Sequence, residues 1–360
     1  MKYVDEFRDR KLIDKVAAEI RKAAKDAPDY NFMEVCGGHT MSICRFGLRD
    51  LLPKNINLIS GPGCPVCVTP NVFVDKAVAL ANLKDVIIAT FGDMLKVPGS
   101  YSSLEDEKAG GRAVKMVYST TDALDLAKKY PNKEIVFLGI GFETTAPTVS
   151  ASILMAKKEK IKNYSVLSSN KTMPEALEAL VKDKGVKIDG FILPGHVSAI
   201  IGTRPYRLLS KVYKKRCVVS GFEPLDILES VLMLVRQDTP DVEAQYKRII
   251  NRLGNALARK SIETVFEKAD SQWRGIGLVK KSGLRIRKEY SGFDAEKRFN
   301  IKVKSLEDNP GCACGDVLKG IKTPLDCKLY AKVCNPENPV GACMVSSEGT
   351  CAAYYKYNVK

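Results

Sequence analysis

Short runs of apolar, β-branched residues alternate with amphipathic stretches between residues 30 and 230. The apolar runs have the length of buried strands, and the stretches between them carry apolar residues at helical spacing. This alternation is typical of strand–helix units around a parallel sheet, so we predict an α/β fold. The predicted strands are 32–35, 56–60, 86–90, 114–118, 134–140, 164–169, 190–194 and 217–221, and the predicted helices between them include 71–83, 122–130, 149–160 and 174–184.

Three sequence patterns occur twice in the same order, each as a strand followed by a glycine-rich loop. FMEVCGGHT resembles LGIGFETTAP, ISGPGC resembles ILPGHV, and IIATFGDML resembles VVSGFEPLD. This repetition favours two similar small parallel-sheet domains, which we assign to residues 30–122 and 123–230. Parallel sheets bind ligands at the carboxyl ends of their strands, so we expect the loops of the two domains to face each other across a cleft.

Helical patterns dominate the rest of the chain. They cover 226–237 and 242–269, and residues 1–25 read as a charged amphipathic helix. We therefore assign residues 1–29 and 231–360 to a third, mainly helical domain that ends in a cysteine-rich tail.

The composition excludes several classes of protein. The chain is 45% apolar with a formal net charge of +15, and no apolar run approaches the eighteen residues of a membrane-spanning helix. The N-terminal segment is too charged for a secretion signal, so we predict a cytoplasmic protein without membrane association. The lysines are scattered, which indicates a solvated basic surface or an acidic protein partner. No nucleic-acid motif or basic cluster with interleaved aromatics is present, and we expect no nucleic-acid partner.

Cysteine is abundant and unevenly placed. A reduced cytosolic chain with eleven cysteines is more consistent with metal or redox chemistry than with a disulfide framework. The tail cysteines Cys312, Cys327, Cys334 and Cys351 are separated by 14, 6 and 16 residues. Four thiolates suit a 4Fe-4S cluster or a structural zinc, and the tail lacks the Cys-x-x-Cys knuckles usual for zinc. Unligated or oxidised thiols are the remaining interpretation.

Two further tail cysteines, Cys314 and Cys343, each lie close in sequence to one of these four. They are either space-filling residues or a dithiol that exchanges electrons with a neighbouring cluster.

Two motifs near the N-terminus supply the other candidates. GPGCPVCVTP places Cys64 and Cys67 at a strand end with the spacing of a redox pair. We expect exposed backbone amides there to lower a thiol pKa and favour the metal-binding thiolate. In MEVCGGHT, Cys36 ends a strand and is a candidate metal ligand, while His39 is either a ligand or a hydrogen-bonded structural residue.

The second half of the chain contributes weaker candidates. His196, in LPGHVSAIIG, is the other histidine of the chain and lies at the echo of the Cys64 loop. Glu143, Thr144 and Thr145, in GFETTAP, either cap the following helix or present polar groups to the cleft. Trp273, Cys44 and Cys217 are interpreted as structural residues.

Together, MEVCGGHT, GPGCPVCVTP, GFETTAP, LPGHVSAIIG and the Cys-x14-Cys-x6-Cys-x16-Cys tail resemble the HypD family of hydrogenase maturation proteins over essentially the whole chain. The resemblance implies a cytoplasmic assembly factor for nickel-iron hydrogenases, on which an iron carrying two cyanides and one carbon monoxide is built. It also implies a 4Fe-4S cluster on Cys312, Cys327, Cys334 and Cys351, with Cys314 and Cys343 as an intervening dithiol. The implied partners are the small chaperone HypC, which shares the iron, and HypE, which delivers cyanide.

These roles agree with the chemistry of the residues. Low-spin ferrous iron with diatomic ligands suits thiolates, so Cys36 and Cys67 are expected to bind it, with Cys64 completing a redox pair. His39 is retained as a candidate site residue. The alternatives are an iron-sulfur-dependent disulfide reductase acting on a protein substrate, and a structural zinc protein. The sequence leaves open whether the protein turns over as an enzyme.

Overall fold

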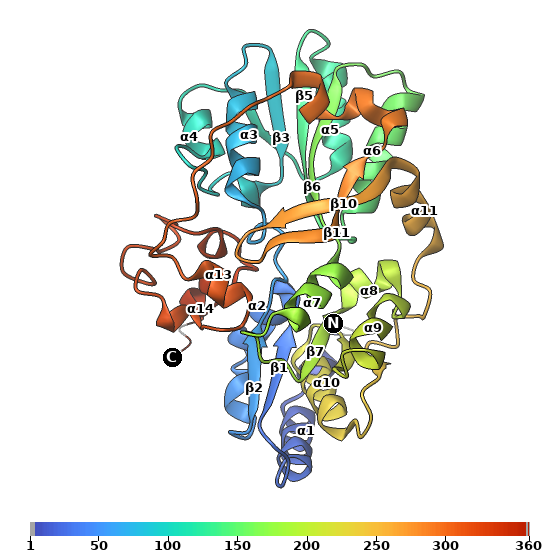
Figure 1. Cartoon of the computed structure of the whole chain (residues 1–360), viewed down its shortest axis with the longest axis vertical. Helices are drawn as coiled ribbons and strands as arrows, with labels where there is room; N and C mark the ends of the chain where they lie inside the picture. The colour runs from blue at the N-terminus through green and yellow to red at the C-terminus, as the bar shows by residue number, and fades with distance from the viewer. Residues whose placement is uncertain (1–3, 358, 360) are drawn as a thin grey trace.

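Two parallel β-sheets organise the chain. In a computed structural model, which describes residues 4–357 and 359, the first sheet has the strand order β2-β1-β7-β8-β9 and the second has the order β4-β3-β5-β6 (Figure 1). All neighbouring strands in both sheets are parallel. The strands are β1 Tyr30–Glu34, β2 Ile56–Ser60, β3 Val86–Thr90, β4 Val114–Met116, β5 Glu134–Gly141, β6 Tyr164–Asn170, β7 Gly190–Pro194, β8 Arg216–Ser220 and β9 Val242–Ala244. All eight predicted strands form, and the prediction of two parallel sheets is confirmed.

The sheets do not follow the predicted division of the chain at residue 122. The first sheet takes β1 and β2 from the first half and β7 to β9 from the second, whereas β3 to β6 form the other sheet. The echoed strands β1 and β5 therefore lie in different sheets, while β2 and β7 share one. The boundaries 30–122 and 123–230 do not separate two domains, because an apolar run does not specify its partner strand.

Helices cover both faces of each sheet. One face of the first sheet packs on α1, α2 and α10, and the two faces of the second pack on α3 and on α5 with α6. Along β3, Val86 and Ile88 face one core while Ile87 and Ala89 face the other, as the two-residue period of a strand requires. The α-helices up to residue 265 are α1 Arg10–Ala23, α2 Gly37–Arg45, α3 Asn71–Ala81, α4 Leu104–Ala109, α5 Thr120–Lys129, α6 Ala146–Lys158, α7 Met173–Lys182, α8 Gly195–Ile201, α9 Arg207–Lys211, α10 Pro224–Arg236 and α11 Ala256–Val265.

The predicted third domain is not a separate helical unit around α1 and α10. Ile13 and Ile20 of α1 and Ile227 of α10 are buried in one core with Phe32 of β1 and Ile192 of β7. Both helices therefore belong to the first sheet. Residues 1–3 of the predicted N-terminal helix lie outside the described residues.

The helix predicted over 242–269 is wrong over most of its length. Residues 242–244 form β9, only α11 is helical, and Phe266–Trp273 form strand β10, which pairs antiparallel with β11, Gly277–Ile286. Gly254 has a φ of +71°, a left-handed conformation that breaks the helical run. From Glu267 to Gln272, half-buried and exposed residues alternate, which is the period of a strand.

The C-terminal tail consists of short helices and turns that lie beside the β10–β11 hairpin (Figure 1). Its short helices are α13 Cys314–Leu318 and α14 Thr350–Lys356. The preceding short helix, α12 Ala295–Phe299, lies against β6 of the second sheet instead. The 3-10 helices are η1 Asp5–Arg8, η2 Leu48–Leu51, η3 Gly92–Met94, η4 Arg204–Tyr206, η5 Lys288–Phe293, η6 Pro324–Asp326 and η7 Ala342–Met344. No helix within residues 4–357 and 359 has the length and apolar character needed to cross a bilayer.

The carboxyl ends of strands from both sheets contact the same tail segment. Ser346 donates a hydrogen bond to Asp93, which follows β3 in the second sheet. Glu348 packs against Gly37, which follows β1 in the first sheet: a Cβ on Gly37 would lie 2.3 Å from the Cβ of Glu348. The loops that follow β1 and β3 thus both contact the tail.

Candidate functional site

Cys36 and the Cys64–Cys67 loop leave adjacent strands at one sheet edge. β1 and β2 are parallel with Glu34 opposite Ser60, so the residues after each strand emerge side by side. Gly37 donates its N–H to the carbonyl of Gly63 at 3.2 Å. A Cβ on Gly63 would lie 2.2 Å from the backbone nitrogen of Cys36, so this approach requires glycine.

The Cys64–Cys67 loop is buried, contrary to expectation. Cys64 is 3% and Cys67 0% exposed, and the backbone N–H of Cys67 donates to the sulfur of Cys64 at 3.2 Å. Burial raises the pKa of Cys67 well above its usual range. The prediction of exposed amides and a lowered pKa is therefore wrong for Cys67. The reason is tertiary: Cys67 lies against the carbonyl of Ala342 in the tail.

The cysteines lie in a series of neighbours that leads from this loop into the tail. The sulfurs of Cys314 and Cys343 lie 2.8 Å apart and are buried. The Cys67 sulfur lies 3.9 Å from the carbonyl of Ala342, the residue before Cys343, and Cys312 lines the same small cavity as Cys314 and Cys343. The series Cys64, Cys67, Cys343, Cys314, Cys312 thus joins residues from opposite ends of the sequence.

The four spaced tail cysteines surround one small cavity. Its wall contains Cys312, Cys327, Cys334 and Cys351 together with Cys314, Cys343, Tyr330 and Met344. In residues 4–357 and 359, no three His, Cys, Asp or Glu side chains are close enough to hold a single metal ion as they stand. A four-iron cluster spreads its cysteine sulfurs more widely than zinc, because each sulfur binds a different iron. The four thiolates around this cavity supply the kind of donor set that such a cluster uses.

Cys36 is half-buried, as are Cys312 and Cys327, and it is the N-cap residue of α2. Burial, together with the nearby carboxyls of Glu348 and Glu34, raises the pKa of its thiol to about 12. Cys36 therefore carries a proton near neutral pH, and a metal that binds its sulfur must displace that proton.

Glu34 is a buried carboxyl that the sequence analysis did not single out. It accepts hydrogen bonds from the hydroxyl of Thr40 and from the backbone N–H of Cys36. Burial raises its pKa to about 7, against the opposing effect of the Thr40 hydroxyl. A carboxylate two residues before Cys36 inside an apolar strand was the signal available in the sequence. Its position gives the Cys36 backbone an acceptor that can change protonation near neutral pH.

The two histidines of the chain both stack on one phenylalanine ring. His39 lies 4.7 Å and His196 4.1 Å from the Phe222 ring, centroid to centroid. The Nε2 of His39 donates to the carbonyl of Gly221 at 2.9 Å, and its buried Nδ1 has no partner among the described residues. Thus His39 and His196 meet at the sheet edge that bears Cys36.

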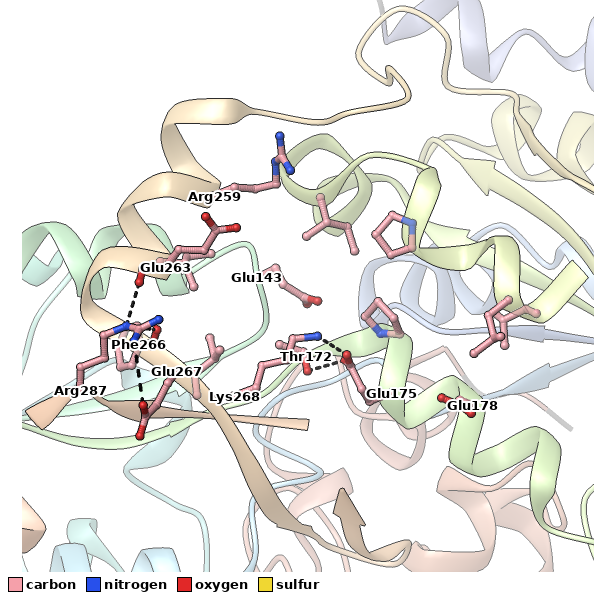
Figure 2. Close-up of a pocket in the computed structure, with 17 residues that line it drawn as sticks. Glu143, Thr172, Glu175, Glu178, Arg259, Glu263, Phe266, Glu267, Lys268 and Arg287 are labelled. Carbon is pink, nitrogen blue, oxygen red and sulfur yellow. Dashed lines mark hydrogen bonds and ion pairs between the residues drawn. The ribbon is translucent and has the colours of Figure 1, made fainter. Parts of the chain in front are cut away.

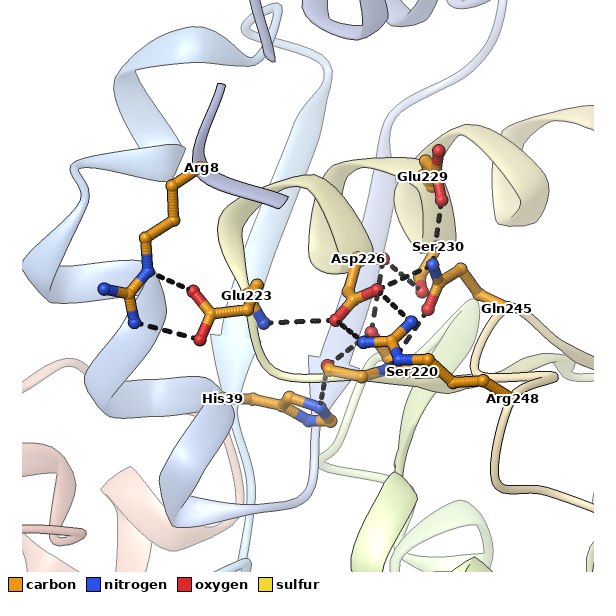
Figure 3. A network of polar contacts seen from close by, with 10 residues as sticks. Arg8, His39, Ser220, Glu223, Asp226, Glu229, Ser230, Gln245 and Arg248 are labelled. Atoms are coloured by element: carbon orange, nitrogen blue, oxygen red, sulfur yellow. Dashed lines mark hydrogen bonds and ion pairs between the residues drawn. The ribbon is translucent and has the colours of Figure 1, made fainter. Parts of the chain in front are cut away.

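Ion pairs hold the loop that accepts the hydrogen bond of His39 (Figure 3). Asp226, which is fully buried, accepts two hydrogen bonds from Arg248, at 2.9 and 2.8 Å, and one from Gln245 at 2.9 Å. Arg8 makes a separate ion pair with Glu223 in the same loop. These contacts hold the 220–226 segment that supplies the Gly221 carbonyl.

Replacement of His39 by Gln is expected to reduce acid destabilisation. Burial lowers the pKa of His39 from 6.5 to about 4, with His196 and Asp226 as its charged neighbours. The unfolded chain binds this proton first, so the stabilisation present above pH 6.5 is lost as the pH falls toward 4. The loss is about 3 kcal/mol in the free energy of unfolding.

Denaturant unfolding at several pH values measures how the free energy of unfolding changes with pH. Between pH 6.5 and 4, stability should fall less steeply in His39→Gln than in the wild type, while His196→Gln, on the exposed side of Phe222, should retain most of the wild-type slope. Equal slopes in wild type and His39→Gln would show that His39 does not titrate as described.

GFETTAP borders a pocket of about 560 Å³ between α7, α9, α11 and the hairpin (Figure 2). Glu143 does not cap α6. Instead, its two carboxylate oxygens accept from the N–H of Met173 at 3.1 and 3.2 Å, at the start of α7, and burial raises its pKa to about 8. Thr145 is the N-cap of α6 but makes no side-chain cap bond. Glu143 reaches this pocket rather than the thiol series.

Trp273, Cys44 and Cys217 are packed away from the cysteine cavity. Trp273 is fully buried and donates from Nε1 to Ser282 at 2.7 Å. Cys44 packs with Tyr354, and Cys217 lies inside β8. Their positions agree with a structural role.

Comparison with known proteins assigns the chain to a family. The family model for HypD, described as the hydrogenase formation hypA family, matches residues 11–358. The hydrogenase maturation factor HypD of Cupriavidus necator is 49% identical over 368 residues, covering 99% of this chain and 97% of that protein. HypD of Rhodobacter capsulatus is 45% identical over 370 residues, covering 99% and 98%. The hydrogenase expression/formation protein HupD of Azotobacter chroococcum is 46% identical over 367 residues, covering 99% and 97%. With the five sequence motifs and these whole-length matches, the chain belongs to the HypD family.

Proposed function

We propose that this protein is a cytoplasmic hydrogenase maturation factor on which the Fe(CN)2CO centre of a nickel-iron hydrogenase is assembled. In this proposal, Cys36 and Cys67 bind the iron, and a 4Fe-4S cluster on Cys312, Cys327, Cys334 and Cys351 supplies electrons. Cys314 and Cys343 connect the two sites. HypC shares the iron and HypE provides the cyanide.

The observation that carries the proposal is the thiol series from Cys64 to Cys312. Thiol–disulfide exchange requires one sulfur to attack another directly, so electrons move as disulfides only between contacting thiols. Here the Cys67 sulfur packs against the Ala342 carbonyl beside Cys343, and the buried pair Cys314 and Cys343 lines the four-cysteine cavity.

The exchange follows from these contacts. The Cys343 thiolate attacks Cys67 of a Cys64–Cys67 disulfide, forming a Cys343–Cys67 bond and releasing the Cys64 thiolate, which takes up a proton. Cys314 then attacks Cys343, releases Cys67 and leaves a Cys314–Cys343 disulfide. Two electrons have passed from the tail dithiol to the loop pair. The cluster, when bound, supplies single electrons that return the tail disulfide to two thiols.

Iron is the cargo of the site, and its ligands come from adjacent strand ends. Thiolates suit low-spin ferrous iron, and Cys36 and the Cys67 loop leave the same sheet edge. Because burial raises the pKa of both thiols, each must lose a proton when iron binds. Reduction of Cys64–Cys67 frees the Cys67 sulfur for this role, so the redox step controls iron binding.

The alternative of a disulfide reductase acting on a protein substrate is less well supported. Such an enzyme needs an accessible attacking thiol, yet Cys64 and Cys67 are 3% and 0% exposed. An internal electron acceptor is more consistent with this burial.

Infrared spectroscopy of the protein, purified anaerobically together with HypC, tests the proposal. Bands of bound cyanide and carbon monoxide are expected. Reduction of a protein disulfide by a preparation without these bands would favour the reductase instead.

A further inference from the structure

Arg274 is a buried cation in the turn that joins β10 to β11. It is 6% exposed and lies between the Cys64–Cys67 loop and the segment that leads to Cys312. A buried guanidinium is costly unless its charge and its N–H groups are balanced, so its partners indicate its role.

On one side, Arg274 holds the loop that contains Cys64 and Cys67. Its backbone N–H donates to the carbonyl of Val68 at 2.9 Å, and its side-chain Nε donates to the carbonyl of Thr69, also at 2.9 Å. Both acceptors directly follow Cys67. The hairpin turn is therefore fixed to the chain that positions the Cys67 sulfur.

On the other side, Arg274 holds the tail. Its Nη1 pairs with Asp308 at 3.0 Å, four residues before Cys312. The next residue, Gly275, approaches the backbone of Gly315 so closely that a Cβ there would lie 2.4 Å from its Cα. One turn thus holds both cysteine segments together.

The charge of Arg274 is only partly balanced. Nη2 is buried and has no partner among the described residues. Arg274, Cys312 and Cys314 line a common pocket of about 400 Å³. The positive charge of Arg274 therefore acts on the end of the four-cysteine site that borders this pocket.

We propose that Arg274 is a positioning residue of the redox site, which clamps the Cys67 loop onto the tail and provides the internal counter-charge for the centre bound by Cys312. The counter-charge part of this inference rests on the proposed 4Fe-4S cluster. A cluster held by four thiolates becomes more negative on reduction, so a nearby buried cation stabilises the reduced form. The clamp maintains the contact between Cys67 and Cys343 that disulfide exchange requires.

The midpoint potential of the reconstituted cluster tests the counter-charge. Arg274→Met keeps an unbranched apolar stem and removes the charge, and it should disfavour reduction about tenfold, a fall of about 59 mV for one electron. Arg274→Lys restores the charge and should recover most of the fall. Arg285→Met removes an exposed arginine of the same hairpin, which pairs with Glu267, and should leave the potential unchanged.

A second pair of variants keeps the test decisive if Arg274→Met holds no cluster. Asp308→Asn removes the carboxylate paired with Arg274 and should raise the potential. The matched control Glu307→Gln removes the same charge one residue away and should shift it less. A wild-type potential in Arg274→Met, or no rise in Asp308→Asn, would overturn the counter-charge.

The role of Arg274 as a clamp can be tested in protein that contains no cluster. Mild oxidation of cluster-free protein, followed by mass spectrometry of disulfide-linked peptides, measures how readily Cys67 and Cys343 form a disulfide. The yield should fall severalfold in Arg274→Met and stay at the wild-type level in Arg285→Met; equal yields would refute the clamp. A wild-type protein that binds no cluster would instead count against the proposed function, and the trapping yield would still decide the clamp.

Discussion

Replacement of Cys327 by Ala is expected to remove the iron-sulfur cluster. Cys327 is one of four spaced cysteines around the tail cavity, and the loss of one thiolate leaves one iron of the cluster without its protein ligand. Iron and sulfide in the anaerobically reconstituted variant should fall from about four per chain to near zero. The brown visible absorbance should be lost with them.

The matched control is Cys217→Ala. Cys217 is equally a cysteine but lies inside β8, away from the cavity. This variant should retain the full complement of iron and sulfide. Stoichiometric zinc without iron in the wild type, or a normal cluster in Cys327→Ala, would contradict the ligand assignment.

Replacement of Cys36 by Ala should remove most of the iron that carries cyanide and carbon monoxide. Cys36 and Cys67 are proposed as its protein ligands, and no other cysteine leaves β1 at that edge. In anaerobically prepared complexes with HypC, the infrared bands should be lost in Cys36→Ala and in Cys67→Ala.

Cys64→Ala should behave differently, because Cys64 is the redox partner of Cys67 rather than a ligand. A prebuilt centre should keep its infrared bands in this variant, while assembly or release fails. Full cyanide and carbon monoxide bands in Cys36→Ala would show that the ligand assignment is wrong, whatever the hydrogenase activity.

The strands of this fold could be predicted because each is a short apolar run between turn residues, but their pairing could not. β1 pairs with β7, which follows six strands later in the chain, and this long-range choice leaves no mark in either strand. The β10 segment was missed for a local reason. Its alternating pattern continues directly from the amphipathic pattern of α11, and the change of period is visible only after Phe266.

The cysteine motifs indicated which thiols matter, whereas their environment depended on the tail. Glycine and proline suggested an exposed Cys64–Cys67 loop, yet Ala342 and Cys343 cover Cys67 from a distant part of the sequence. Arg274 was missed for the same reason. It lies in a turn within a mixed-charge stretch, and its role becomes visible only through its contacts with Thr69 and Asp308.

Mössbauer spectroscopy of anaerobically prepared protein with isotopically enriched iron, in complex with HypC, tests the central claim most directly. The claim is that one chain holds a four-iron cluster in the tail and a separate iron at the Cys36 edge, joined by contacting thiols. The account predicts a cluster component and a distinct low-spin ferrous component, the second lost in Cys36→Ala while the first remains. A single component that responds to both Cys36→Ala and Cys327→Ala, or no cluster component at all, would contradict it.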